Sequence, residues 1–163
     1  MKSVYVLLAN SDRHLNNIIE VAIRDACYEQ VHLECQTTHR LDEVLHRGSG
    51  DEFALIFLAS NNLISGPPQH ASHCTPADVA RAIRTLKQAR SVCIMAVGAH
   101  PHDEPQLLEA GAEKVFGLLI DRDELKVEVR RALNIPEPVV GIERSRWSLA
   151  SGLLRSLQKL RHS

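Results

Sequence analysis

The sequence predicts an α/β protein in which a five-stranded, doubly wound parallel sheet is covered by helices on both faces. Apolar segments of strand length alternate five times with segments of helical periodicity. The segments 4–9, 53–59 and 91–99 are apolar almost throughout, which is typical of strands that are buried on both faces. A length of 163 residues with 44% hydrophobic residues is sufficient for one domain with its own core.

Local signals set the order of the elements. We expect strands over 4–9, 31–37, 53–59, 91–99 and 114–120. We expect the helices that follow them to begin at Asp12, Thr38, Thr75, Asp103 and Asp121. Thr75, Pro76 and Asp78 together form a capping box with proline at the first helical position. Gly111 is predicted to end the fourth helix, and 60–75 is expected to be one long irregular loop.

The C-terminal part has a different character. We expect a body over 1–134, a proline-stiffened linker over 135–141 and an amphipathic helix within 142–163. Five basic residues accompany Glu143 alone in the last segment, a net charge of +4, whereas the body is mildly acidic. The apolar stripe of this helix can pack on its own body, on its copy in a dimer, or in the groove of a partner.

The block Leu107–Leu125, LLEAGAEKVFGLLIDRDEL, resembles the last third of a response-regulator receiver domain. Segments 4–15 and 53–60 are similar to the first and third strands of that family, so the resemblance covers residues 2–134. It implies a flavodoxin-like fold of receiver type and a place in two-component signalling.

The resemblance also implies where phosphorylation chemistry would lie. The acidic pair that holds Mg²⁺ in receivers falls on Asn10 and Ser11, and the phosphoacceptor falls on Ala59. The hydroxyl residue falls on Gly98 and the lysine on Leu118. None of these residues offers the carboxylate, nucleophile or cation that phosphoryl transfer needs. The sequence therefore predicts a degenerate form, a pseudo-receiver without catalytic residues and without a cofactor.

From this pattern we expect a phosphorylation-independent module that binds a protein partner or its own copy, as a homodimer, in bacterial signal transduction or transcription regulation. The expected surface comprises the fourth and fifth helices, the strand between them and the last helix, with these candidate contacts: Val115, Trp147, Leu153, Leu154 and Leu157. Val115 falls where receivers carry an aromatic switch residue. Scattered cysteines and the absence of a signal segment favour the cytoplasm. A net charge of −1 favours neither nucleic-acid nor membrane contact.

Histidine-bearing loops favour an alternative, a sensor of a metal ion or small ligand. The candidate ligands in two loops at one end of the sheet are His70, His73, Cys74, His100 and His102. Asp12 and His14 are also similar to the start of cobalamin-binding α/β domains, although Asn17 replaces the glycine of that motif. The simpler interpretation makes Asp12 a helix cap and His14 a solvent-exposed residue.

Overall fold

The computed structural model describes residues 2–27, 31–48, 53–59, 63–65, 72–86 and 91–136 of the chain. Its helices are α1 (Arg13–Ala26), α2 (Leu41–Gly48), α3 (Pro76–Thr85), α4 (Glu104–Glu109) and α5 (Arg122–Leu133). Its strands are β1 (Lys2–Ala9), β2 (Val31–Thr38), β3 (Phe53–Ala59), β4 (Leu63–Ser65), β5 (Ser72–Cys74), β6 (Cys93–Ala99) and β7 (Lys114–Gly117). The predicted helix within 142–163 lies outside the described residues, together with Trp147, Leu153, Leu154 and Leu157.

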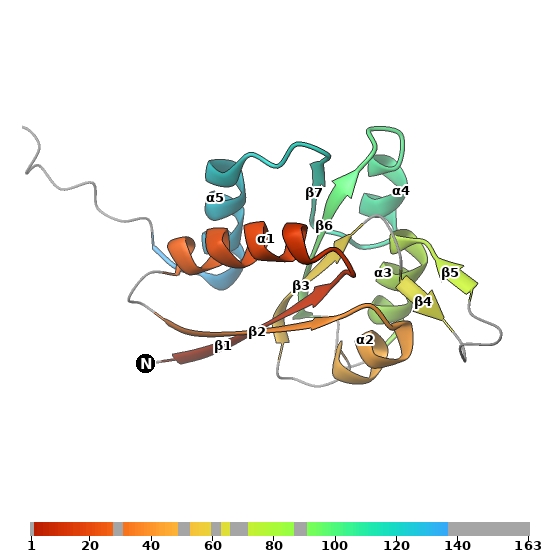
Figure 1. Ribbon diagram of the computed structural model, residues 1–163, viewed down its shortest axis with the longest axis horizontal. Coiled ribbons are helices and arrows are strands. Elements are labelled where there is room, and N and C mark those ends of the chain that lie inside the picture. Colours follow the sequence, from red (N-terminus) through yellow and green to blue (C-terminus); the bar gives the residue numbers. More distant parts are fainter. Residues whose placement is uncertain are drawn as a thin grey trace, which may run out of the picture.

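The main sheet has five strands in the order β2-β1-β3-β6-β7, and every neighbouring pair in it is parallel. Figure 1 shows α1 and α5 on one side of this sheet and α2, α3 and α4 on the other. The predicted α/β fold with a doubly wound parallel sheet is confirmed. In such a sheet the chain reverses its winding direction between β1 and β3, and functional loops gather at the carboxyl ends of the strands.

Each side of the sheet has its own hydrophobic core. Under α1 and α5, Ile19, Ile23 and Val129 pack against Phe57 and Met95. Under α2, α3 and α4 a second core contains these residues: Val44, Ile56, Val79, Ile83, Ile94 and Leu107. Successive residues of β3 alternate between the two cores, which explains why that strand is apolar along nearly its whole length.

Three of the predicted helix starts are built as expected. Asp12 caps α1 by accepting hydrogen bonds from the backbone N–H groups of His14 and Leu15 at 2.8 and 3.1 Å. Asp121 caps α5 in the same way. At α3, Thr75 Oγ1 accepts from the Asp78 backbone at 3.2 Å and donates to the Asp78 carboxylate at 2.6 Å. These bonds satisfy backbone donors that the first helical turn leaves free.

Several predicted boundaries were wrong. The helix expected to begin at Thr38 begins at Leu41, because Thr38 is still the last residue of β2. The segment expected as one irregular loop contains β4 and β5, which pair antiparallel as a small separate sheet. Strands of three residues are too short to produce a visible alternation in the sequence. The last strand ends at Gly117 instead of at residue 120, because Leu118 and Leu119 turn outward and are 62% and 96% exposed.

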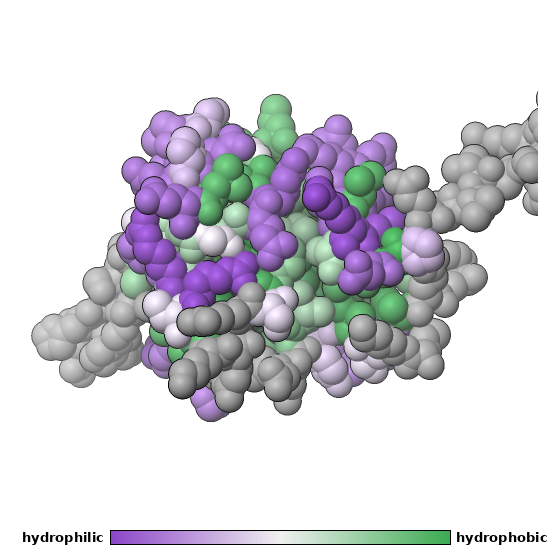
Figure 2. All heavy atoms as spheres, turned by 180° about the vertical axis from the view of Figure 1, so that it is seen from behind, coloured by the Kyte–Doolittle hydropathy of each residue, from purple (hydrophilic) through white to green (hydrophobic). Residues whose placement is uncertain are grey.

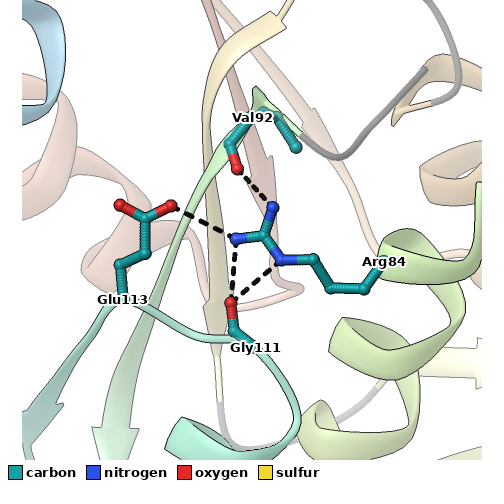
Figure 3. Close-up of polar contacts among 4 residues, drawn as sticks. All are labelled: Arg84, Val92, Gly111 and Glu113. Carbon is teal, nitrogen blue, oxygen red and sulfur yellow. Dashed lines mark hydrogen bonds and ion pairs between the residues drawn. The ribbon is translucent and has the colours of Figure 1, made fainter. Parts of the chain in front are cut away.

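Arg84, on the last turn of α3, joins three segments at the amino ends of the strands (Figure 3). Its guanidinium donates to the Gly111 carbonyl from Nε at 3.0 Å and from Nη2 at 2.8 Å. It also donates to the Val92 carbonyl at 2.7 Å and lies 3.3 Å from the Glu113 carboxylate. Gly111 has φ +104°, and a Cβ added there would lie 2.7 Å from Arg84 Cγ. The planar guanidinium thus fixes the turn between α4 and β7 against α3.

Candidate functional site

The five positions predicted to have replaced the phosphorylation residues lie at the carboxyl ends of β1, β3, β6 and β7. Ala9 pairs with Leu58, Ala59 pairs with Val97, and Ala99 pairs with Gly117, so these strands end close to one another. Asn10 and Ser11 follow β1 directly, and Leu118 follows β7. The structure therefore brings the sequence-predicted positions to one edge of the sheet, where open α/β sheets carry their functional groups.

Asn10 is buried and its side chain forms hydrogen bonds on both sides. Its Nδ2 donates to Asn16 Oδ1 at 3.1 Å and to the Asp12 carbonyl at 3.2 Å, and its Oδ1 accepts from the Asp12 N–H at 3.0 Å. Asn16, also buried, donates back to the Asn10 carbonyl at 3.3 Å. The two amides are neutral and satisfy each other, so this network is stable without a bound cation.

Ala59 has only 4% of its surface exposed and packs in the core under α1 and α5. A methyl group at this position offers no oxygen to a phosphoryl donor. Ser11 is exposed beside Asn10 and has a hydroxyl in place of a carboxylate. Hard cations such as Mg²⁺ are held in proteins mainly by carboxylate oxygens, so the Asn10–Ser11 pair is a poor ligand set for this ion.

Gly98 lies within β6 with a left-handed backbone, at φ +68°. The pairing of β6 with β7 also shifts register between Ala96 and Ala99, so the strand is irregular around this glycine. Serine and especially β-branched threonine are disfavoured at such a φ. The backbone here therefore suits glycine better than the hydroxyl residue that receivers carry.

Leu118, the residue predicted at the lysine position, faces solvent. The nearest lysine in the sequence, Lys114, binds Glu124 at 2.6 Å and lies 4.0 Å from Glu128, both on α5. This pairing raises the pKa of the Lys114 ammonium and keeps its charge on the α5 side of β7. Val115, at the aromatic switch position, is half-buried against the core under α2, α3 and α4.

Several carboxylates near this end of the sheet already form hydrogen bonds or ion pairs with groups of the chain itself. Asp12 and Asp121 accept backbone hydrogen bonds as helix caps. Asp103 lies 3.3 Å from His102 Nε2. Glu43 accepts a hydrogen bond from the buried Thr38 hydroxyl. Within the described part of the chain, no group of three or more His, Cys, Asp or Glu side chains is arranged to hold a metal ion.

The predicted histidine ligands are only partly brought together. The His100 and His102 rings stack with centroids 5.4 Å apart and planes inclined by 17°, an arrangement in which the rings face each other instead of converging on an ion. His70 lies outside the described residues, and His73 and Cys74 belong to β5. The metal-sensor interpretation stays a prediction.

Two cysteine thiols are held in their neutral form by burial. Burial raises the pKa of Cys93 to about 12 and that of Cys35 to about 11. A thiol must lose its proton to act as a nucleophile, so neither group is suited to covalent chemistry near neutral pH.

Sequence reasoning missed three residues of this region. Asn16 completes the amide network, and its place six residues after Asn10 gave no recognised motif. Leu108 and Leu119 are exposed apolar residues. The sequence predicts a helix and a strand at these positions, but it does not show that their side chains face solvent. Figure 2, which views the molecule from the side opposite to Figure 1, shows hydrophobic surface reaching the outside in separate places among hydrophilic side chains.

Comparison with known proteins relates this architecture to receiver domains. No family model matches the sequence, and no curated protein matches it either. Among solved structures, the chain is similar to the receiver domain of a sensor histidine kinase from Pseudomonas aeruginosa, which has magnesium coordinated in its active-site cleft. The TM-score is 0.63 at 17% identity, covering 81% of this chain and 98% of that one.

It is likewise similar to a response regulator receiver domain protein from Methanospirillum hungatei, with TM-score 0.61 and 14% identity over 82% of this chain and 95% of the other. A chemotaxis protein from Vibrio cholerae gives TM-score 0.57 and 16% identity over 80% and 98%. The predicted receiver-type fold is confirmed. Within the described residues, no helix is both long enough and apolar enough to cross a membrane.

Proposed function

We propose that the chain is a pseudo-receiver that acts by binding proteins in bacterial signal transduction or transcription regulation, independently of phosphorylation and without enzymatic activity. One observation carries the proposal. The receiver fold is kept, while Asn10 and Ser11 follow β1 where receivers carry their acidic cation site, and the buried Asn10 amide is bonded to Asn16 of α1. We place this module in the cytoplasm, as a homodimer or bound to a protein partner, and not on nucleic acid or a membrane.

Other features of the same edge support the proposal. Phosphoryl transfer depends on positioned charges around the transferred group. Ala59 offers no acceptor oxygen, Gly98 has a backbone that disfavours a hydroxyl residue, and Leu118 offers no positive charge. Restoring the receiver residue at one of these positions by substitution would leave the other positions unsuited to phosphoryl transfer.

We place the partner surface on α4, β7 and α5, together with the segment 142–163. Leu108, Leu118 and Leu119 are exposed apolar side chains in this part of the body, and Val115 lies half-buried on the intervening strand. Buried apolar anchors supply much of the binding free energy in protein interfaces. In the tail, Trp147, Leu153, Leu154 and Leu157 are the proposed contacts.

The test of phosphorylation independence uses the full chain with acetyl phosphate and Mg²⁺, followed by intact mass measurement. We expect no added phosphate and no Mg²⁺-dependent NMR shift near Ala59. The receiver domain from the Pseudomonas kinase is the positive control. A stoichiometric phosphoaspartate on this chain would overturn the proposal.

The partner surface has its own test. Leu119→Glu places a charge on an exposed residue and should weaken capture of the physiological partner without changing the melting temperature. Val21→Glu, at another exposed apolar residue on α1, is the matched control. Equal capture by the wild type and by Leu119→Glu would contradict this placement.

A further inference from the structure

The two edge strands of the main sheet differ in how well they are protected. β7 has four residues and an interrupted register with β6. In contrast, β2 pairs with β1 along all eight of its residues without a register shift and contains no proline, lysine or arginine. Proteins protect exposed sheet edges with short strands, bulges, prolines and lysines. Among the described residues, no strand pairs with the outer edge of β2, which is the first strand in the order of the sheet.

The side chains of β2 alternate between two kinds of surface. Val31, Leu33 and Cys35 are only half-buried against the core under α1 and α5. On the opposite face, His32 and Glu34 lie 3.7 Å apart, with side chains 61% and 45% exposed. Within the described part of the chain, β2 thus offers an edge with no neighbouring strand, a partly covered apolar row and one pair of complementary polar groups.

We propose that β2 is a self-pairing edge, at which a second copy of this chain adds its own β2 antiparallel to form a continuous ten-stranded sheet. The proposal rests on the protein-binding function above and adds to it a second surface, separate from α4, β7 and α5, whose partner is a second copy of the chain. A two-fold axis perpendicular to the sheet relates the two copies, so each side chain stays on its own face of the joined sheet. Residues that lie directly opposite in an antiparallel pair have their side chains on the same face. The axis must therefore pass beside one residue, which lies opposite its own copy.

Charge complementarity selects Leu33 as that central residue. With this register, His32 of each copy lies directly opposite Glu34 of the other, so two imidazole–carboxylate pairs form. On the other face Leu33 meets Leu33, and Val31 meets Cys35. Centring on Glu34 would place two carboxylates together, and centring on His32 would place two imidazoles together. Opposite pairs stabilise neighbouring strands, whereas like charges directly opposite destabilise them.

The helix above this edge is compatible with such an arrangement. Glu20 and Arg24 of α1 are joined at 2.7 Å, and α1 shares one hydrophobic core with the inward-facing residues of β2. Because the axis is perpendicular to the sheet, both α1 helices lie on the same face of the joined sheet. The ion pair is neutral overall, so the two copies do not bring a net like charge together there.

Light scattering of the full chain over a wide concentration range tests the proposal. We expect a monomer–dimer equilibrium. His32→Glu should raise the dimer dissociation constant roughly tenfold, because carboxylates then face each other twice. The double variant His32→Glu, Glu34→His exchanges the two groups and should restore the dissociation constant to within about twofold of wild type.

Leu119→Glu, next to the opposite edge of the sheet, is the control and should leave the dimer intact. Thermal melts of each variant check that it is folded. A chain that stays monomeric throughout, a double variant as weak as His32→Glu, or a dimer lost with Leu119→Glu would each overturn self-pairing. The phosphorylation measurement on the same samples tests the pseudo-receiver function separately, so the two proposals can fail independently.

Discussion

At the scale of single residues, the Asn10–Asn16 network offers a direct measurement. Asn10→Ala removes three hydrogen bonds and leaves the buried Asn16 amide without its main partner. We expect the free energy of unfolding to fall by about 1–3 kcal/mol. Chemical denaturation measures the loss, and Asn17→Ala, an exposed neighbour on α1, is the control that should change stability by less than about 0.5 kcal/mol.

The Cys93 thiol predicts an alkaline loss of stability. Burial raises its folded-state pKa to about 12 from the ordinary 9.0, so the protonated thiol stabilises the fold fully below pH 9.0. Between pH 9.0 and about 12 the unfolded chain releases this proton and the folded chain does not. Stability should therefore fall by about 1.4 kcal/mol per pH unit in that range.

Denaturation of wild type and Cys93→Ala at several pH values isolates this contribution. The variant loses a sulfur atom from the core and is less stable at neutral pH, but its stability should decline less steeply above pH 9.0. Parallel curves for the two proteins would contradict burial as the cause.

At the scale of elements, Arg84 and Gly111 act as one unit. Gly111→Ala combines an unfavourable positive φ with a Cβ too close to Arg84 Cγ. We expect it to lower the free energy of unfolding by about 1–3 kcal/mol. In an Arg84→Ala background the steric part disappears, so the same substitution should cost less. A double-mutant cycle measures this coupling, and strictly additive effects would show that the contact does not matter.

Arg84→Met alone should lower the free energy of unfolding by about 1–3 kcal/mol, since it removes the bonds to the Gly111 and Val92 carbonyls. Arg81→Met, one turn earlier, is the matched control because Arg81 makes an exposed ion pair with Asp78. Exposed pairs of this kind contribute little, so the control should change stability by less than about 1 kcal/mol.

Elements were predictable from the sequence where periodicity and capping agree. Helices α1, α3 and α5 show helical periodicity together with a capping residue, which is Asp12, Thr75 or Asp121. The buried strands β1, β3 and β6 are visible as continuous apolar runs. The β4–β5 hairpin was not predictable, because three residues per strand show no period. Arg84 was not predictable either, since its bonds join residues up to 29 positions apart. At the site, sequence reasoning named five positions that the structure brings to one edge of the sheet, but not the Asn16 partner or the left-handed backbone of Gly98.

At the scale of the whole molecule, the two cores share the same strands. Phe57 of β3 belongs to one core, and its neighbours Ile56 and Leu58 belong to the other. Neither core can open without exposing the other side of the sheet. We expect a single cooperative transition, with equal denaturation midpoints by far-ultraviolet circular dichroism and by NMR signals of methyl groups in the two cores. Two separated midpoints would show that the layers unfold independently.

The neutral end of β1 has a consequence for the conditions under which this protein can work. Two neighbouring carboxylates repel each other when no cation lies between them, so a site of that kind links the stability of the fold to the supply of divalent ions. Asn10 and Ser11 carry no charge, and the bonds between Asn10 and Asn16 need no cation. The proposed module would therefore be equally well folded in a magnesium-starved cell and in a replete one.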